Sequence, residues 1–273
     1  MRRPLTLLLA AVLTAAPALA ADPPSLAPQT EPQPAAVRIR PKKVPASSSA
    51  DDVDLLAPDT DVIDAPTTAV LDYGGYSSRS RFFAHGGLLE YVDFGVFQGL
   101  NIGASLTMDG LIGNDRTVRL RAPDVQVKYR FFDGQDWLPS LAAGFDGQGY
   151  DYSNLDHRYN NRQRGFFVVA SEELGVPGLM IHPSINISDF DTNAFFGALP
   201  LSFDIADKVE LLAEWDNINN FGDSRFNAGI RGFLSPHFAV DFAVRAIGQG
   251  GRFSNGDLRG PERVVQLRYS ANF

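Results

Sequence analysis

Cysteine is absent from all 273 residues of the chain. Its absence excludes disulfide-stabilised scaffolds, thiol catalysis and cysteine-ligated zinc. Basic residues are also scarce, since 24 lysines and arginines stand against 32 aspartates and glutamates and give a formal net charge of −8. Because a nucleic-acid-binding protein needs a basic face, we expect no nucleic acid among the partners. Apolar side chains are plentiful, at 44% of the chain, which is too many for a disordered protein.

The chain has a single long apolar run, at its N-terminus. Arg2 and Arg3 precede an almost wholly apolar stretch over 5–16, and Pro17 then leads into Ala18-Leu19-Ala20. A positive start, a short apolar centre and a small-x-small end predict a secretory signal peptide that is removed after Ala20. Beyond residue 20 no run of 18 or more apolar residues occurs, which excludes a helical membrane protein.

The segment 21–66 has the composition of a disordered leader. It holds nine of the chain's 18 prolines and no aromatic residue, so it cannot bury enough apolar surface to offset its ordering entropy. We expect either a solvated, extended leader or a docking arm for periplasmic proteins of an envelope complex. The acidic block of this leader comprises Asp51, Asp52, Asp54, Asp59, Asp61 and Asp64.

From about residue 67 to the end, apolar and polar residues alternate with the period of a β-strand. In the last segment, for example, Val265 and Leu267 alternate with Gln266 and Arg268. The sequence therefore predicts three parts: a signal peptide over 1–20, a disordered proline-rich periplasmic leader over 21–66 and a β domain over 67–273. The strands are predicted at 68–74, 86–97, 100–109, 122–132, 138–147, 164–172, 178–188, 194–205, 208–217, 224–234, 237–247 and 262–273.

Several features favour a membrane barrel over a soluble sandwich, which also alternates. The strands are about ten residues long, the length that a tilted strand needs to cross a bilayer. Short connections alternate with longer ones, such as 75–85 and 148–163, and this asymmetry is typical of outer-membrane barrels. We therefore predict an all-β, transmembrane, antiparallel up-and-down barrel of about 12 strands, with ten as the alternative. Its location would be the outer membrane of a Gram-negative bacterium, with both termini in the periplasm.

The C-terminal residues form an alternating apolar register that ends on an aromatic side chain. This pattern resembles the signal that outer-membrane barrels present to the barrel assembly machinery, so we expect that machinery and outer-membrane lipid as partners. The residues of this signal are Val265, Leu267, Tyr269 and Phe273.

The polar faces of the predicted strands carry charges of both signs. These side chains predict either a self-neutralising network that fills a narrow lumen or the wall of a selective pore, and we favour the packed lumen. The lumen-facing candidates are Lys128, Arg130, Glu210, Glu214, Arg225, Arg231, Asp241, Arg245 and Arg268.

Enzymatic signals are weak. His182 and Ser184 share one face of a predicted strand, which leaves a barrel hydrolase as a third hypothesis, but an activated nucleophile also needs an oriented base and an oxyanion site. No phosphate loop, dinucleotide fingerprint or calcium-loop spacing is present. We therefore expect a non-enzymatic protein without cofactor or metal.

The predicted outer loop over 148–163 is rich in tyrosine. Tyr150, Tyr152 and Tyr159 stand among Asn, Asp and Arg, a composition suited to recognition. The simpler interpretation is a solvated outer loop.

The segments 138–149 and 165–171, with the strand residues 213–216 and 227–231, resemble YjbH-like and related bacterial outer-membrane barrel proteins. The resemblance implies a barrel over 68–273 and a role in the envelope, such as polysaccharide export. Small barrels of this sort also occur in gliding-motility complexes. We expect a structural or interaction component of an envelope complex first, and a small passive or polysaccharide-linked channel second.

Overall fold

The computed structural model describes residues 58–113, 117–135, 137–153, 155, 157–161, 163–187, 195–219, 224–249 and 260–273. The chain divides into two units, Met1–Ile39 and Arg40–Phe273, and every described residue belongs to the second. The predicted signal peptide and most of the predicted leader thus lie outside the described residues.

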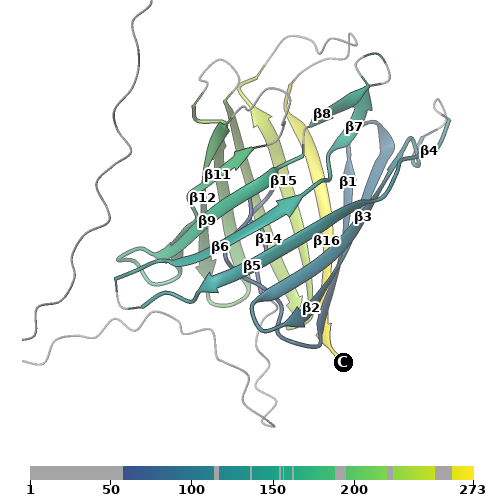
Figure 1. Cartoon of the computed structure of the whole chain (residues 1–273). Helices are drawn as coiled ribbons and strands as arrows, with labels where there is room; N and C mark the ends of the chain where they lie inside the picture. The colour runs from purple at the N-terminus through teal and green to yellow at the C-terminus, as the bar shows by residue number, and fades with distance from the viewer. Residues whose placement is uncertain are drawn as a thin grey trace, which may run out of the picture. The chain divides into compact units, whose positions relative to one another are not determined.

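The described residues form one closed antiparallel β-barrel of 12 strands (Figure 1). Two of the named strands, β10 and β11, are pieces of one barrel strand, and β4 is a short extension that pairs with β3. The barrel strands are β1 Gly75–Phe83, β2 Gly87–Phe97, β3 Leu100–Asp109, β5 Asp124–Phe132, β6 Ser140–Asp146, β9 Gly165–Glu173, β10 Leu179–Ile181 with β11 Ser184–Ile187, β12 Phe195–Ile205, β13 Val209–Asp216, β14 Arg225–Ser235, β15 Phe238–Ile247 and β16 Glu262–Asn272.

Pairing of the first strand with the last closes the barrel. Gly75 of β1 lies opposite Asn272 of β16, and the register continues to Phe82 opposite Val265. Closure gives each of the 12 described barrel strands a neighbour on both sides, as a sheet in hydrocarbon requires. The predicted class and the strand number of 12 are confirmed.

Unlike a soluble β protein, the barrel has charged side chains on its inner face and apolar side chains on its outer face. In β13, Glu210, Glu214 and Asp216 are buried, whereas Leu211 and Trp215 on the alternate positions are exposed. Since successive side chains of a strand point to opposite faces, the charged face lines the lumen and the apolar face forms the exterior.

One barrel strand is interrupted between its two pieces. Pro183 has no backbone N–H to give to the ladder, so β10 ends at Ile181 and β11 begins at Ser184. The backbone still pairs at the break, since His182 N donates to Pro200 O at 2.9 Å and Ala170 N donates to Pro183 O at 3.0 Å. The predicted continuous strand over 178–188 is therefore two pieces.

The first predicted strand, 68–74, is wrong: these residues form no strand, and the first strand is β1, which lies in the predicted loop 75–85. The physical reason is the composition of β1. Its inward residues Ser77 and Arg79 alternate with outward Ser78 and Ser80, so polar residues occupy both faces and the apolar alternation is lost.

The connections differ in length at the two ends of the barrel. The C-terminus lies at the lower end in Figure 1, where Phe273 N donates to Gly74 O at 3.0 Å. The connections at this end are 98–99, 133–139, 174–178, 206–208 and 236–237. The opposite end carries the β4 strand Arg119–Leu120, the hairpin of β7 Tyr150–Ser153 with β8 Arg158–Asn161, and the short helix η1 Ala84–Gly86. No described helix is long and apolar enough to cross a membrane.

Candidate functional site

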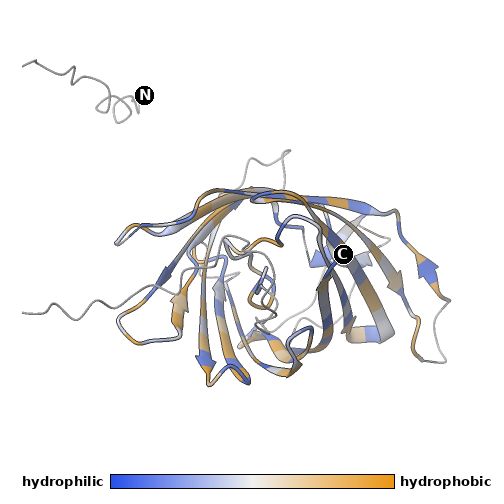
Figure 2. Ribbon diagram, turned by 90° about the horizontal axis from the view of Figure 1, so that it is seen from below, coloured by the Kyte–Doolittle hydropathy of each residue, from blue (hydrophilic) through white to orange (hydrophobic). Residues whose placement is uncertain are grey.

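The candidate site is the lumen together with the segment 58–74, which we call the plug. The plug lies inside the ring of strands when the barrel is viewed from below (Figure 2). It folds back on itself, since Asp61 pairs with Pro66 in an isolated β-bridge and Val62 N donates to Ala65 O at 3.0 Å. It begins beside the 236–237 turn and returns to β1 at the same end of the barrel.

The structure differs from the sequence prediction at this segment. Residues 58–66 belong to the predicted disordered leader, yet Val62 is 1% exposed and Ile63 and Ala65 are buried. Apolar side chains in the plug pack on the wall: Val62 and Ile63 form one cluster with Leu212, Ala243 and Val264. Charged side chains of the lumen wall also contact the plug.

Arg231, on the inner face of β14, is the centre of those contacts and is 0% exposed. Its Nη1 donates to Asp59 Oδ1 at 2.6 Å and to Glu210 Oε2 at 2.8 Å, and its Nε donates to Asp241 Oδ1 at 2.8 Å. Its Nη2 donates to the backbone oxygens of Asp61 and Val62 at 3.1 and 2.9 Å. One guanidinium therefore joins three carboxylates and the backbone of the plug.

Asp61 of the plug bridges two further arginines. Its carboxylate pairs with Arg268 of β16 and with Arg79 of β1. Each arginine also has a partner on the wall: Arg268 Nε donates to Asp241 Oδ2 at 2.6 Å, and Arg79 Nη2 donates to Asp93 Oδ2 at 2.9 Å. The Asp61 carboxylate thus links β1 and β16, the first and last strands of the chain, which pair to close the barrel.

Asp64 occupies a third cationic position. Its carboxylate pairs with Arg81 of β1 at 2.7 Å and with Arg245 of β15, and Arg245 Nη1 also donates to Glu262 Oε2 at 2.7 Å. Burial by itself raises the pKa of Asp64, but the charges of Arg245, Arg81 and Arg164 outweigh it and hold that pKa below its ordinary value. Asp64 is therefore an ionised, bound carboxylate at neutral pH.

At Glu214 of β13 the wall supplies the carboxylate and the plug supplies the hydrogen-bond donors. Its Oε1 accepts hydrogen bonds from the backbone N–H groups of Ile63, Asp64 and Ala65 at 2.7, 2.8 and 2.8 Å. Its Oε2 accepts from Asn227 Nδ2 at 2.9 Å, and the side chain is 0% exposed. Three backbone donors at the tip of the plug are satisfied by one carboxylate oxygen.

Lys128 of β5 binds the plug from another wall. Its Nζ donates to the backbone oxygens of Thr60, Thr67 and Ala69 at 2.7, 3.3 and 2.9 Å. The amine therefore joins the two limbs of the plug, one before and one after its tip.

The nine lumen-facing candidates divide by role. Lys128, Glu214, Arg231, Arg245 and Arg268 contact the plug, and Glu210 and Asp241 orient Arg231. Arg225 pairs with Asp216 at 2.8 Å, the carboxylate that also holds Arg164. Arg130 lies apart, where it pairs at 2.7 Å with the exposed Asp133 of the lower turn.

Sequence reasoning missed Arg79, Arg81 and Arg164, and it assigned the plug carboxylates to solvent. Arg164 Nε donates to Asp64 O at 3.1 Å, and its other nitrogens bind Asp216. A usable signal was present: an acidic segment directly precedes a barrel whose inner faces are rich in arginine.

Two cavities lie beside the plug in the part of the lumen that the structure describes. One of about 70 Å³ lies between the plug and the wall and is lined by charged groups that include Asp61, Asp64, Arg79, Arg81 and Lys128. It has room for a few water molecules. A second cavity, of about 20 Å³, lies where the plug enters beside His237.

The geometry does not support a nucleophile at Ser184. His182 is buried and its Nδ1 lies 2.7 Å from Ser171 Oγ, while its Nε2 lies 3.4 Å from Ser202 Oγ. Ser184 Oγ has no hydrogen-bond partner among the described residues. An activated serine needs the base within hydrogen-bond reach, so the described contacts of His182 do not support the third hypothesis, a hydrolase built on His182 and Ser184. Within the described part of the chain, no group of three or more His, Asp or Glu could hold a metal ion.

The tyrosine-rich segment 148–163 contains the β7–β8 hairpin, so the predicted plain loop is wrong in part. The rings of Tyr152 and Tyr159 meet edge to face with centroids 5.3 Å apart, and Arg121 lies 4.3 Å over the Tyr152 ring. Gln148 Nε2 lies 3.5 Å from the Tyr159 hydroxyl. Tyr150 is in β7, but its side chain lies outside the described residues. These contacts tie the hairpin together.

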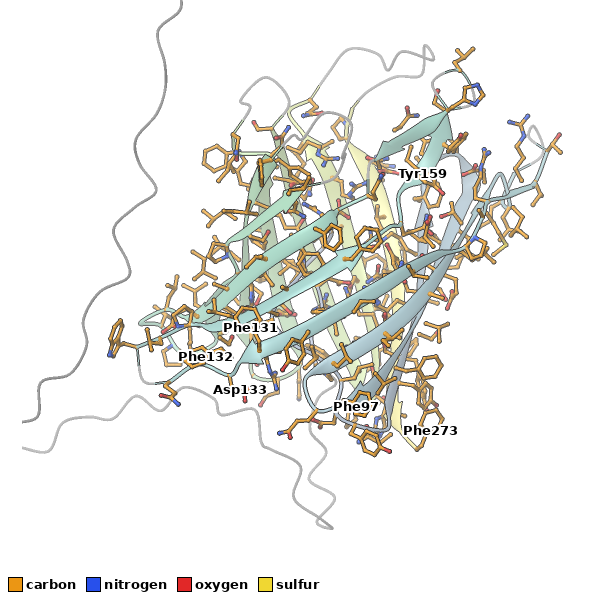
Figure 3. All side chains as sticks on the ribbon, viewed as in Figure 1. Phe97, Phe131, Phe132, Asp133, Tyr159 and Phe273 are labelled. Atoms are coloured by element: carbon orange, nitrogen blue, oxygen red, sulfur yellow. The ribbon has the colours of Figure 1, made fainter. Side chains whose placement is uncertain are left out.

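The C-terminal residues lie on the exterior, where Val265, Leu267 and Tyr269 alternate with the buried Gln266 and Arg268. Phe273 is 87% exposed, and its ring stacks on those of Tyr76 and Phe94, with centroids 4.9 and 6.4 Å apart. Figure 3 places Phe273 with Phe97, Phe131 and Phe132 toward the lower end of the barrel. This arrangement is that of an aromatic girdle at a membrane interface.

No family model matches the sequence, and no curated protein matches it. Among solved structures, a mutant of the Rh. blastica porin is 14% identical, with a TM-score of 0.34, over 68% of this chain and 55% of the porin. The NanC porin is 10% identical with a TM-score of 0.36 over 72% of this chain and 99% of that one. Omp33, an outer membrane protein of Acinetobacter baumannii, is 10% identical with a TM-score of 0.33, over 74% of this chain and 99% of Omp33. The chain spans just over half the length of the first porin, and the fold assignment rests on its own strand pairings.

Proposed function

We propose that the protein is a non-enzymatic outer-membrane barrel that its own N-terminal segment keeps closed. The observation that carries this proposal is the set of contacts through which Asp59, Asp61 and Asp64 of the plug bind arginines of the lumen wall. Among the described residues, these contacts hold the plug inside the lumen, so a structural or interaction role fits better than an open pore.

The distribution of side chains supports placement in the outer membrane. Val125, Val127, Tyr129 and Phe131 of β5 are exposed on the exterior, whereas Lys128 faces the plug. Water would leave this apolar exterior unfavourably hydrated, and hydrocarbon solvates it well. The predicted signal peptide would direct the chain out of the cytoplasm.

The orientation follows from the asymmetry of the two ends. The C-terminus, the plug entrance and the short turns share one end, and short turns face the periplasm in this class of barrel. Both termini are therefore assigned to the periplasm, and the end with the β7–β8 hairpin is assigned to the cell exterior.

The leader before the plug supplies the means of interaction. Residues 21–57 precede the plug entrance and carry the composition of an extended arm. We assign this arm to docking on periplasmic proteins of an envelope complex, for which polysaccharide export and gliding motility are the expected settings. The resemblance to YjbH-like proteins stays a prediction. Deletion of 21–57 is expected to remove periplasmic partners from a pull-down, and an unchanged partner set would contradict the docking role.

Conductance in planar bilayers tests the closed barrel. We expect the mature chain to give no stable current, because the plug occupies the lumen. The triple variant D59N/D61N/D64N removes three carboxylates and is expected to give channel openings. A large steady current from the unmodified chain would contradict the proposal.

A channel that opens when the plug leaves is the second candidate function. It is favoured by the way the plug is held, through reversible ion pairs and hydrogen bonds rather than by strand pairing with the barrel. Openings of the unmodified chain under an applied voltage step, absent at low voltage, would favour this gated channel over the permanently closed barrel.

A further inference from the structure

A polar group lies on the exterior of the barrel wall, outside the lumen. Glu90 of β2 alternates with the inward residues Leu89 and Tyr91, so its side chain is on the outer face. Ser78 Oγ donates to Glu90 Oε1 at 2.6 Å and Ser80 Oγ donates to Glu90 Oε2 at 2.5 Å. We call these three side chains the outer polar patch.

The depth of the patch makes it unusual. Phe94 lies four residues from Glu90 along β2 and stacks with Phe273 in the aromatic girdle. At about 3.3 Å per residue and a tilt of about 40°, Glu90 lies roughly 10 Å from that girdle, in an apolar band about 25 Å tall. Phe82 and Leu88 are also on the outer face, beyond Glu90. The carboxyl is therefore inside the apolar band.

Other parts of the exterior differ from this wall. The outward residues of β5 are all apolar, and Val168 and Ile185 are exposed on β9 and β11. The outward-facing charged residues Glu172 of β9 and Arg263 of β16 lie near the ends of their strands. Hydrocarbon offers no hydrogen bond to the remaining lone pairs of Glu90, so a carboxyl at this depth indicates a polar partner.

We infer that the outer polar patch is the centre of a surface through which two copies of this chain associate side by side in the membrane. A second copy in the same bilayer has its aromatic girdle at the same interface, so its outer polar patch lies at the same depth. A polar centre with an apolar rim is complementary to itself across a two-fold axis. The small side chains of Ser78, Ser80 and Ala104 let the two walls approach closely.

The rim of the surface is apolar and partly exposed. Tyr269 faces outward on β16 opposite Ser78, and Ile102 faces outward on β3 opposite Phe94. Pairing of the walls removes these side chains from lipid and surrounds the glutamates with protein. Two carboxyl groups that share one proton across the axis then form a hydrogen bond that lipid tails cannot provide.

The absence of native cysteine allows a clean cross-linking test. Val92 lies on the outer face of β2 opposite Ser78 and takes no part in the patch hydrogen bonds. Val168 is the control, because it lies on the outer face of β9, four strands further around the sheet from β2. Each is replaced singly, as V92C and V168C, in outer membranes exposed to a mild oxidant.

We expect a disulfide-linked homodimer from V92C and none from V168C. Addition of E90L, or of S78A and S80A together, to V92C is expected to abolish the dimer while the heat-dependent gel shift of the folded barrel is retained. If E90L prevents folding, the serine variant decides. No dimer at position 92, equal dimer at both positions, or V92C linked only to a different protein would overturn the inference.

Discussion

Arg231 Nη1 lies 2.6 Å from Asp59 Oδ1, and this pair joins the inner wall of the barrel to a segment 172 residues earlier in the chain. The same guanidinium binds Glu210 and Asp241 of the neighbouring strands. Arg231 therefore contributes both to the wall and to the closure of the lumen, and its removal is the most damaging single change that we expect.

The substitution Arg231→Met tests this double role. It leaves the buried carboxylates of Glu210 and Asp241 without their shared cation, which we expect to lower the free energy of unfolding by about 3–5 kcal/mol. Urea titration followed by the heat-dependent gel shift measures the loss. Arg130→Met is the control, because its partner Asp133 is 76% exposed and such a pair contributes less than about 1 kcal/mol. Equal losses from the two variants would contradict the central position of Arg231.

Glu214 is expected to hold the tip of the plug through its acceptor atoms. Glu214→Ala leaves three buried N–H groups of the plug without a partner, each at a cost of about 1–3 kcal/mol, whereas Glu214→Gln keeps a carbonyl acceptor. We expect protease cleavage within 58–74 to rise strongly in the alanine variant and only slightly in the glutamine variant. Ser184→Ala serves as the control, because Ser184 lies on the inner wall and its hydroxyl has no hydrogen-bond partner among the described residues. If the alanine and control variants are cleaved at the same rate, the plug is not held by Glu214.

Acid is expected to release the plug. The pKa of Asp64 in the folded protein is held below its ordinary value of 3.8, so its ionised form stabilises the plugged state above that value. As the pH falls below 3.8 this contribution weakens progressively, because the released segment binds the proton more readily than the bound one. Bilayer conductance is therefore expected to rise with acid, and the acid-dependent rise is expected to be smaller in Asp64→Asn. A current independent of pH would contradict this linkage.

The sequence predicted the barrel wall well and the plug poorly, for reasons visible in single elements. In β13, Glu210 and Glu214 alternate with Leu211 and Trp215, so both the strand and its inward face could be predicted. In β1, Ser78 and Ser80 replace apolar residues on the outer face, and the strand was mistaken for a loop.

The plug could not be predicted because its order depends on distant partners. The first part of the plug, 58–66, belongs to the proline-rich segment 21–66, which holds no aromatic residue and has too little apolar surface to fold alone. It becomes ordered only where Arg231, Arg268 and Arg245 supply cations and Glu214 accepts its backbone N–H groups. Those residues lie about 150 or more positions away in the chain, and only barrel closure brings them to Asp59, Asp61 and Asp64.

The most direct test of the closed lumen is the chemical accessibility of a cysteine placed in the plug. In a chain without native cysteine, Val62→Cys puts a single thiol at a side chain that is 1% exposed, and Asp133→Cys puts one on the exposed lower turn. A water-soluble maleimide is applied to the folded barrel in membranes and again after denaturation. We predict rapid labelling of Asp133→Cys in the folded state and labelling of Val62→Cys only after denaturation. Equally rapid labelling of both in the folded state would show that the segment lies outside the barrel.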